Sequence, residues 1–183
     1  MMALQHPGLF SAVAAHSADM YFEYAYLPEF PVAVRGLERA GGLSAFLQTI
    51  GKGPLSGREE HAAVNIVAMA ACYSPNPQSP HLFDLPFDER TGELMRDVWS
   101  RWKEKDPLEY AKSQTAALRR LGLIYLDCGR RDEFYLNLGA RMFSRELRKQ
   151  GIAHTYEEFD GGHSNVQFRY DTSLRKLAEY FGA

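Results

Sequence analysis

A histidine and a carboxylate each follow a stretch that is predicted to be a β-strand. His163 lies in a Gly-Gly-His-Ser sequence after the apolar and aromatic stretch 153–159, and Asp132 follows the apolar stretch 122–126. An imidazole held at the end of a strand can take up a proton and return it. A neighbouring carboxylate fixes the tautomer of the imidazole and stabilises its charged form. The two residues therefore predict an acid–base pair of the kind that activates a nucleophile.

The spacing of the pair agrees with this interpretation. Asp132 and His163 are 31 residues apart, which leaves room for one helix and one strand between them. Parallel strands connected in this way bring the two loops side by side. Asp127 and Glu133 are alternative carboxylates. Asp132 also suits the N-cap of the helix predicted from Phe134, and this capping role is compatible with holding the histidine.

The composition predicts one soluble globular domain. The chain has 183 residues, of which 45% are hydrophobic and 24% are charged. A formal net charge of −2 gives no reason to expect nucleic acid or an anionic membrane as a partner. No apolar run approaches the roughly 20 residues that span a bilayer, and the first residues do not form a signal peptide. We therefore expect a cytoplasmic protein that acts on a small molecule.

The cysteines and histidines do not predict a metal site. Cys72 and Cys128 show no metal-binding spacing, and the six histidines show no His-x-x-x-His pattern. We expect neither metal nor other cofactor, and two buried, unpaired thiols. Cys128 is expected in the loop that carries Asp132, where an alternative role is to line the site.

The order of the elements predicts the α/β fold class. Apolar runs predict three parallel strands near residues 9–15, 122–127 and 153–159. Residues 20–107 are too long for a simple crossover, so they are predicted to be a helical cap inserted into a single domain that comprises residues 1–183. Besides a short helix at residues 1–5, helices are expected at 32–39, 43–49, 58–72, 92–103, 108–121, 134–150 and 165–181.

Two details of these helices can be predicted further. The helix at 58–72 has alanines and branched residues all round, so we expect it to be buried on every side. Ser164 and Gln167 match a capping box, which would begin the final helix directly after His163.

Three motifs, in this order, resemble the putative-esterase (esterase D-like) branch of the α/β-hydrolases. They are the segment 3–13, the Gly-x-x-Asp-x-Phe loop at 129–134, and the Gly-x-His end of the last strand at 161–163. The resemblance implies the carboxyl-terminal part of an α/β-hydrolase fold. It also implies a serine esterase that cleaves a carboxylic ester or thioester, with Asp132 as the acid and His163 as the base.

The sequence departs from this family at the nucleophile. The Gly-x-Ser-x-Gly turn that carries the serine does not occur in these 183 residues. Ser17 lacks flanking glycines, so we do not expect it to be the nucleophile. We expect a fragment that supplies the acid and the base but not the serine, and that is inactive alone. In the family, the serine precedes the segment that matches Met1.

Four residues are expected to contact the substrate, namely His16, Ser17, Tyr21 and Trp99. The alternative for the aromatic residues is that they simply pack the inserted cap on the core. The alternative function is a non-catalytic binding or interaction module derived from an α/β-hydrolase. An exposed sheet edge beside the strand at 9–15 would then favour self-association.

Overall fold

The computed structural model describes residues 2–182, and the chain divides into two compact units. The first unit consists of residues up to 25 together with residues from 106 onward, and the second consists of residues 26–105. The first unit contains the sheet and the acid–base pair. The predicted arrangement, a single domain with an inserted cap at residues 20–107, stays a prediction.

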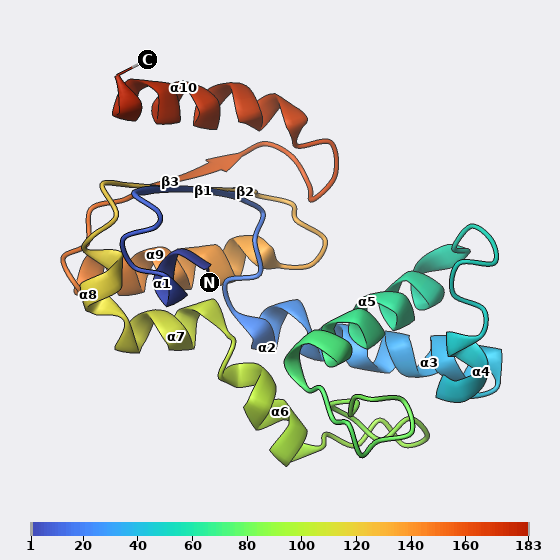
Figure 1. The fold of residues 1–183 in the computed structure, drawn as a ribbon. Helices are drawn as coiled ribbons and strands as arrows, with labels where there is room; N and C mark the ends of the chain where they lie inside the picture. The colour runs from blue at the N-terminus through green and yellow to red at the C-terminus, as the bar shows by residue number, and fades with distance from the viewer. Residues whose placement is uncertain (1, 183) are drawn as a thin grey trace. The chain divides into compact units, whose positions relative to one another are not determined.

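The first unit alternates strands and helices (Figure 1). Its elements are α1 (Met2–Gln5), β1 (Ala12–His16), α2 (Phe22–Ala25), α7 (Pro107–Ser113), α8 (Thr115–Leu118), β2 (Leu123–Gly129), α9 (Leu136–Lys149), β3 (Thr155–Phe159), the 3₁₀ turn η2 (Gln167–Arg169) and α10 (Tyr170–Phe181).

The three strands form one parallel sheet in the order β1-β2-β3. Ala12 lies opposite Leu123, and Tyr125 lies opposite Thr155. Helix α10 covers one face of the sheet, and α9 covers the other together with α1, α7 and α8 (Figure 1). The predicted α/β fold with three parallel strands is confirmed. Because the strands run in parallel, the loops that follow them all leave from the same edge of the sheet.

Side chains of β2 alternate between an apolar face and a polar face. Ile124 and Leu126 pack into the core under α9 with Phe143 and Leu147. This core excludes water from the sheet, and burial of such side chains is the main force that holds α9 in place.

The opposite face of the sheet carries a buried polar network. Asp127 accepts hydrogen bonds from His16 Nδ1, Arg169 Nε and the Tyr125 hydroxyl, each at 2.8 Å. The Nε2 of His16 lies 2.9 Å from Ser173 Oγ on α10. A buried carboxylate is tolerated only when such partners compensate its charge. The network therefore attaches α10 to the sheet by specific polar contacts.

The chain leaves and re-enters the first unit at one point. Asp106 is buried and accepts the backbone N–H of Phe22 at 2.8 Å. Its other carboxylate oxygen accepts the N–H of Leu108 at 2.8 Å and so caps α7. The N–H of Leu108 also approaches the carbonyl oxygen of Met20 at 3.1 Å. The two ends of the insertion are thus bonded to each other.

The second unit is helical. Its elements are η1 (Leu27–Glu29), α3 (Phe30–Ala40), α4 (Leu43–Leu47), α5 (Gly57–Tyr73) and α6 (Arg96–Lys103). Helices α3 and α5 pack so closely at Gly36 that a Cβ there would overlap the carbonyl oxygen of Glu59. Trp102 is fully buried and donates its Nε1 hydrogen to Ser74 Oγ at 2.9 Å. No helix within residues 2–182 has the length and apolar character needed to span a membrane.

Several sequence-based boundaries were wrong. Strand β2 continues to Gly129, so Cys128 lies in the strand and not in the loop. The final helix begins at Tyr170 after a 3₁₀ turn, and Ser164 is exposed without capping it. The helix expected at 108–121 is interrupted at Gln114. Helix α5 is buried on one face only, because its other positions are exposed to solvent. The residues at the extreme ends, Met1 and Ala183, lie outside the described part.

We expect the Asp127→Ala substitution to destabilise the first unit by about 3 kcal/mol, because it leaves the partly buried Arg169 and His16 without their carboxylate. Urea unfolding followed by circular dichroism measures the change. Glu157→Gln is the matched control, since Glu157 also contacts Arg169 but is more exposed. Equal effects of the two substitutions would contradict the assigned importance of Asp127.

Candidate active site

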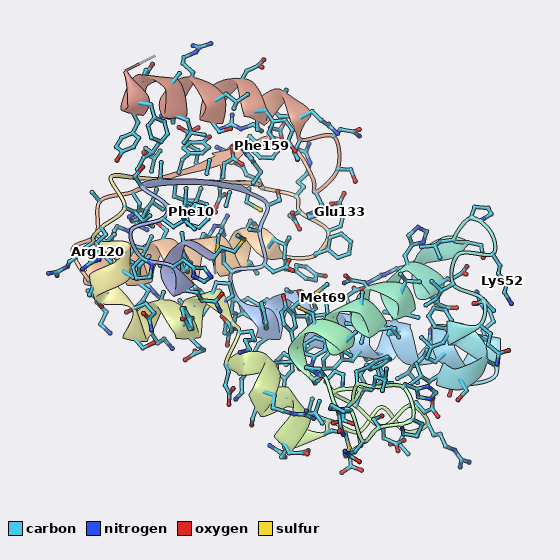
Figure 2. All side chains as sticks on the ribbon, in the orientation of Figure 1. Phe10, Lys52, Met69, Arg120, Glu133 and Phe159 are labelled. Atoms are coloured by element: carbon cyan, nitrogen blue, oxygen red, sulfur yellow. The ribbon has the colours of Figure 1, made fainter. Side chains whose placement is uncertain are left out.

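The loops after β2 and β3 contact each other directly through their backbones. The N–H of Arg130 donates to the carbonyl oxygen of Phe159 at 2.9 Å, and the N–H of Arg131 donates to that of Gly161 at 2.9 Å. A Cβ at Gly129 would lie 2.5 Å from the carbonyl oxygens of both Gly161 and Gly162. Only glycine fits this approach. Figure 2 shows Glu133, from the loop after β2, and Phe159, the last residue of β3, toward the same end of the sheet.

This contact brings Asp132 and His163 together. His163 Nδ1 lies 3.1 Å from Asp132 Oδ2. The other oxygen, Oδ1, accepts the backbone N–H groups of Phe134 at 3.0 Å and Leu136 at 3.4 Å, where α9 begins. The Asp132 side chain is fully buried, whereas 38% of the His163 side chain is exposed. Asp132 is not the N-cap of α9, because that helix begins at Leu136 and Tyr135 is its N-cap residue. Its two oxygens nevertheless have separate partners, the histidine and the amides that precede and begin the helix.

The pair shifts the pKa values of both groups. The hydrogen bond that His163 donates to Asp132 is the main cause that raises the pKa of His163 above its ordinary value, and burial opposes it only in part. Burial tends to raise the pKa of Asp132, but the hydrogen bonds from His163 and the Phe134 amide outweigh it and lower that pKa. Both shifts favour the imidazolium–carboxylate state, which is the state that follows proton uptake by His163.

The second ring nitrogen of His163 is free for chemistry. Nδ1 faces the carboxylate and therefore carries the hydrogen in the neutral tautomer. Nε2 makes no hydrogen bond to any residue in the described part of the chain. The ring of Phe134 packs edge-on against the imidazole with centroids 5.0 Å apart. The geometry can support a general base on a partly exposed imidazole with a buried orienting acid.

The two alternative carboxylates have other partners. Glu133 Oε2 accepts the backbone N–H of His163 at 2.7 Å. Asp127 lies on the polar face of the sheet, which α10 covers, and binds His16 and Arg169 there. The structure therefore brings only Asp132 against the imidazole.

Two of the expected substrate contacts lie at the end of β1, where His16 is the last residue of the strand and Ser17 follows it. Both ring nitrogens of His16 are engaged, by Asp127 and by Ser173, so His16 is not brought together with His163. Ser17 is buried and adopts a left-handed backbone conformation with a φ of 43°. A hydroxyl buried in this way is not exposed to a substrate carbonyl.

The two expected aromatic contacts have partners other than the acid–base pair. The Tyr21 hydroxyl donates to Glu23 Oε2 at 2.6 Å. Trp99 belongs to the second unit, where it is buried against Phe30 with ring centroids 5.6 Å apart. Trp99 thus packs within the second unit itself.

Cys128 contacts the site from a strand, although the sequence pattern predicted it in a loop. Its thiol lies 3.6 Å from Asp132 Oδ2 and is fully buried. Burial is the main cause that raises the pKa of this thiol to about 12. Strand alternation gives a signal for this position, because Cys128 follows Leu126 by two residues and shares its face. Cys72, by contrast, is exposed, so the expectation of two buried thiols was wrong.

The ionisable side chains around His163 are bonded within the chain. Asp132 contacts the ring, and Glu133 contacts the backbone nitrogen. Residues 2–182 contain no group of three or more histidine, cysteine or acidic side chains arranged to hold a metal ion.

Comparison with known proteins gives the family. A family model described as putative esterase matches residues 1–174. The chain belongs to this family. A solved structure of a ferulic acid esterase is similar at 22% identity with a TM-score of 0.33, over 49% of this chain and 33% of that one. The chain thus spans about a third of the length of that esterase. No curated protein matches the chain.

The pair predicts a pH-dependent stability. Because the pKa of His163 is raised in the folded state, the protonated histidine stabilises the fold at pH values below the ordinary histidine pKa of about 6.5. This contribution is lost as the pH rises through the folded pKa of His163. Because the pKa of Asp132 is lowered in the folded state, the ionised carboxylate stabilises the fold at pH values above about 3.9. This stabilisation is lost as the pH falls through the folded pKa of Asp132. We therefore expect Asp132→Asn to reduce the free energy of unfolding more at pH 5.5 than at pH 9, as measured by urea titration.

The control for this substitution is Asp160→Asn, which removes an exposed carboxylate from the neighbouring loop. Equal losses for Asp132→Asn at the two pH values would show that the imidazolium is not bound by Asp132.

The cysteines give a second measurable outcome. In the native protein, a thiol reagent such as DTNB should react rapidly with Cys72 and not with Cys128, because Cys128 is buried and its pKa is raised to about 12. After unfolding, two thiols should react. The Cys72→Ser variant, which should show no rapid reaction, is the control. Rapid loss of both thiols in the folded chain would contradict the burial of Cys128.

Proposed function

We propose that this member of the putative-esterase family carries the acid and the base of a serine-type hydrolase of carboxylic esters or thioesters. The observation that supports the proposal is the contact of His163 Nδ1 with the buried Asp132, which leaves Nε2 of this partly exposed side chain without a hydrogen bond to any residue from 2 to 182. Family membership supports the esterase class. A small-molecule ester is the proposed substrate.

In this proposal, a serine attacks the acyl carbonyl while His163 Nε2 takes the hydroxyl proton. The imidazolium is stabilised by Asp132, and it then gives the proton to the leaving alcohol or thiol. Water attacks the resulting acyl-enzyme with His163 again as the base, and this step releases the acid and the free serine. Asp132 stays ionised throughout.

The nucleophile in this proposal is not one of the serines of the 183 residues. None lies in a Gly-x-Ser-x-Gly turn, and Ser17 is buried. Ser164 is exposed but directly follows the base in the chain. Without the serine and its oxyanion-hole donors, the chain alone lacks both the covalent step and the main electrostatic stabilisation of the transition state. We therefore propose that it is inactive by itself.

The test compares p-nitrophenyl acetate hydrolysis by the 183-residue chain and by a longer polypeptide read from the DNA upstream of codon 1. The 183-residue chain should show no turnover. A longer polypeptide with an in-frame Gly-x-Ser-x-Gly should hydrolyse the ester, and His163→Ala in it should lower kcat by at least about a thousandfold. Asp160→Asn should leave the rate unchanged.

Two results would contradict the proposal. Turnover by the 183-residue chain that is lost in Ser17→Ala would place the nucleophile at Ser17. Full activity of a longer polypeptide that carries His163→Ala would remove the base from its proposed role.

A non-catalytic interaction module is the second candidate, and the edge of the sheet favours it. Among the described strands, β1 pairs only with β2, so its other edge offers free backbone groups. Self-association through this edge would appear as a concentration-dependent increase in mass by analytical ultracentrifugation. An ester-hydrolysing longer polypeptide that stays monomeric would decide for the enzyme.

A further inference from the structure

We propose that Glu133 is a positioning residue that fixes the backbone of His163 and thereby the direction of its imidazole. For its meaning in catalysis, the inference rests on the proposed function. The geometric claim, in contrast, can be tested on the 183-residue chain without any activity.

The carboxylate of Glu133 contacts two consecutive residues of the β3–α10 loop. Its Oε2 accepts the His163 N–H at 2.7 Å, a short distance that is typical of a hydrogen bond to a charged acceptor. A Cβ at Gly162 would lie 2.5 Å from Oε1 and 2.9 Å from Oε2. Gly162 therefore leaves the space that the carboxylate occupies, and any larger residue would displace it.

The loop needs such an attachment. Gly161 and Gly162 give its backbone wide conformational freedom, and Asn165 adopts a left-handed φ of 60°. The hydrogen bond from Arg131 N–H holds the loop at Gly161. Glu133 holds the same loop two residues later, at the residue that carries the imidazole.

Asp132 and Glu133 together hold His163 at two points. Asp132 contacts the ring nitrogen at 3.1 Å, and Glu133 contacts the backbone nitrogen at 2.7 Å. Asp132 and Glu133 are consecutive, and Asp132 is itself bonded to the amides of Phe134, just before α9, and Leu136, its first residue. Both contacts with His163 therefore start from one firmly held segment. Two attachments restrict the rotation of His163 far more than either restricts it alone.

Glu133 also contributes charge. The charges that act on His163 are those of Asp132, Asp19 and Glu133, and all three raise its pKa. The hydrogen bond from the His163 amide is the main cause that lowers the pKa of Glu133, so its carboxylate is ionised at neutral pH. Removing this side chain should therefore change both the backbone and the titration of His163.

The experiment measures two properties of His163 in the 183-residue chain by NMR, the hydrogen-exchange rate of its amide and the pKa of its ring. The His163→Gln variant assigns the ring signal among the six histidines. Glu133→Ala should speed amide exchange by about tenfold or more, the factor that corresponds to a lost hydrogen bond to a charged group, and should lower the ring pKa. Glu133→Gln should restore most of the amide protection but keep the lower pKa, because its amide oxygen can accept without charge.

Asp160→Asn is the matched control, since it removes a charge from the same loop without touching His163. It should leave the amide exchange of His163 unchanged. Gly162→Ala offers a second approach, because its Cβ displaces the carboxylate, and it should reproduce the exchange rate of Glu133→Ala. Gly53→Ala is its control, as a Cβ there meets nothing within 4 Å.

The inference is overturned if Glu133→Ala and Gly162→Ala leave the exchange rate and the ring pKa of His163 at the values of their controls. The proposed function fails separately, if no longer polypeptide hydrolyses esters through His163. In an active longer polypeptide, Glu133→Gln should shift the pH–rate profile in the direction of the lowered His163 pKa.

Discussion

The close approach of two loop backbones at Gly129 is the contact on which the site depends. The space there is so limited that a single methyl group would overlap the carbonyl oxygens of Gly161 and Gly162. Because the backbones of the two loops touch without intervening side chains, the side chains of one loop lie within hydrogen-bond distance of those of the other. Asp132 and His163 meet for this reason, although they are far apart in the chain. The parallel sheet supplies the common edge, and the glycine permits the contact.

The carboxylates near this edge show how burial assigns roles. A buried acid must have compensating partners, and each acid here has a different set. Asp127 has a histidine, an arginine and a tyrosine on the α10 face. Asp132 has the imidazole and the amides that begin α9. Glu133, which is more exposed, binds a main-chain amide. The polar face of the sheet thus holds the last helix in place, while the loop acids hold the histidine.

The sequence alone could predict the fold class, the three strands and the juxtaposition of Asp132 with His163, because apolar runs and loop spacing follow directly from parallel topology. It could not predict that β2 extends to Gly129, since Cys128 and Gly129 follow a charged residue and are kept in the strand by pairing with Glu158 and Phe159 of β3. The capping box at Ser164 failed because a 3₁₀ turn precedes α10. The sequence identifies Glu133 only as an alternative to Asp132, because a hydrogen bond to a distant backbone amide leaves no pattern in the sequence.

The bonds around Asp106 have a consequence for how this architecture can diversify. The segments that flank residues 26–105 are joined at Phe22, Met20 and Leu108, so contacts inside the first unit hold the two ends of the helical segment together. The entropy of closing a long loop grows only slowly with its length. A lineage can therefore lengthen, shorten or replace the whole helical segment between these two anchored ends while the histidine and its acid keep their geometry.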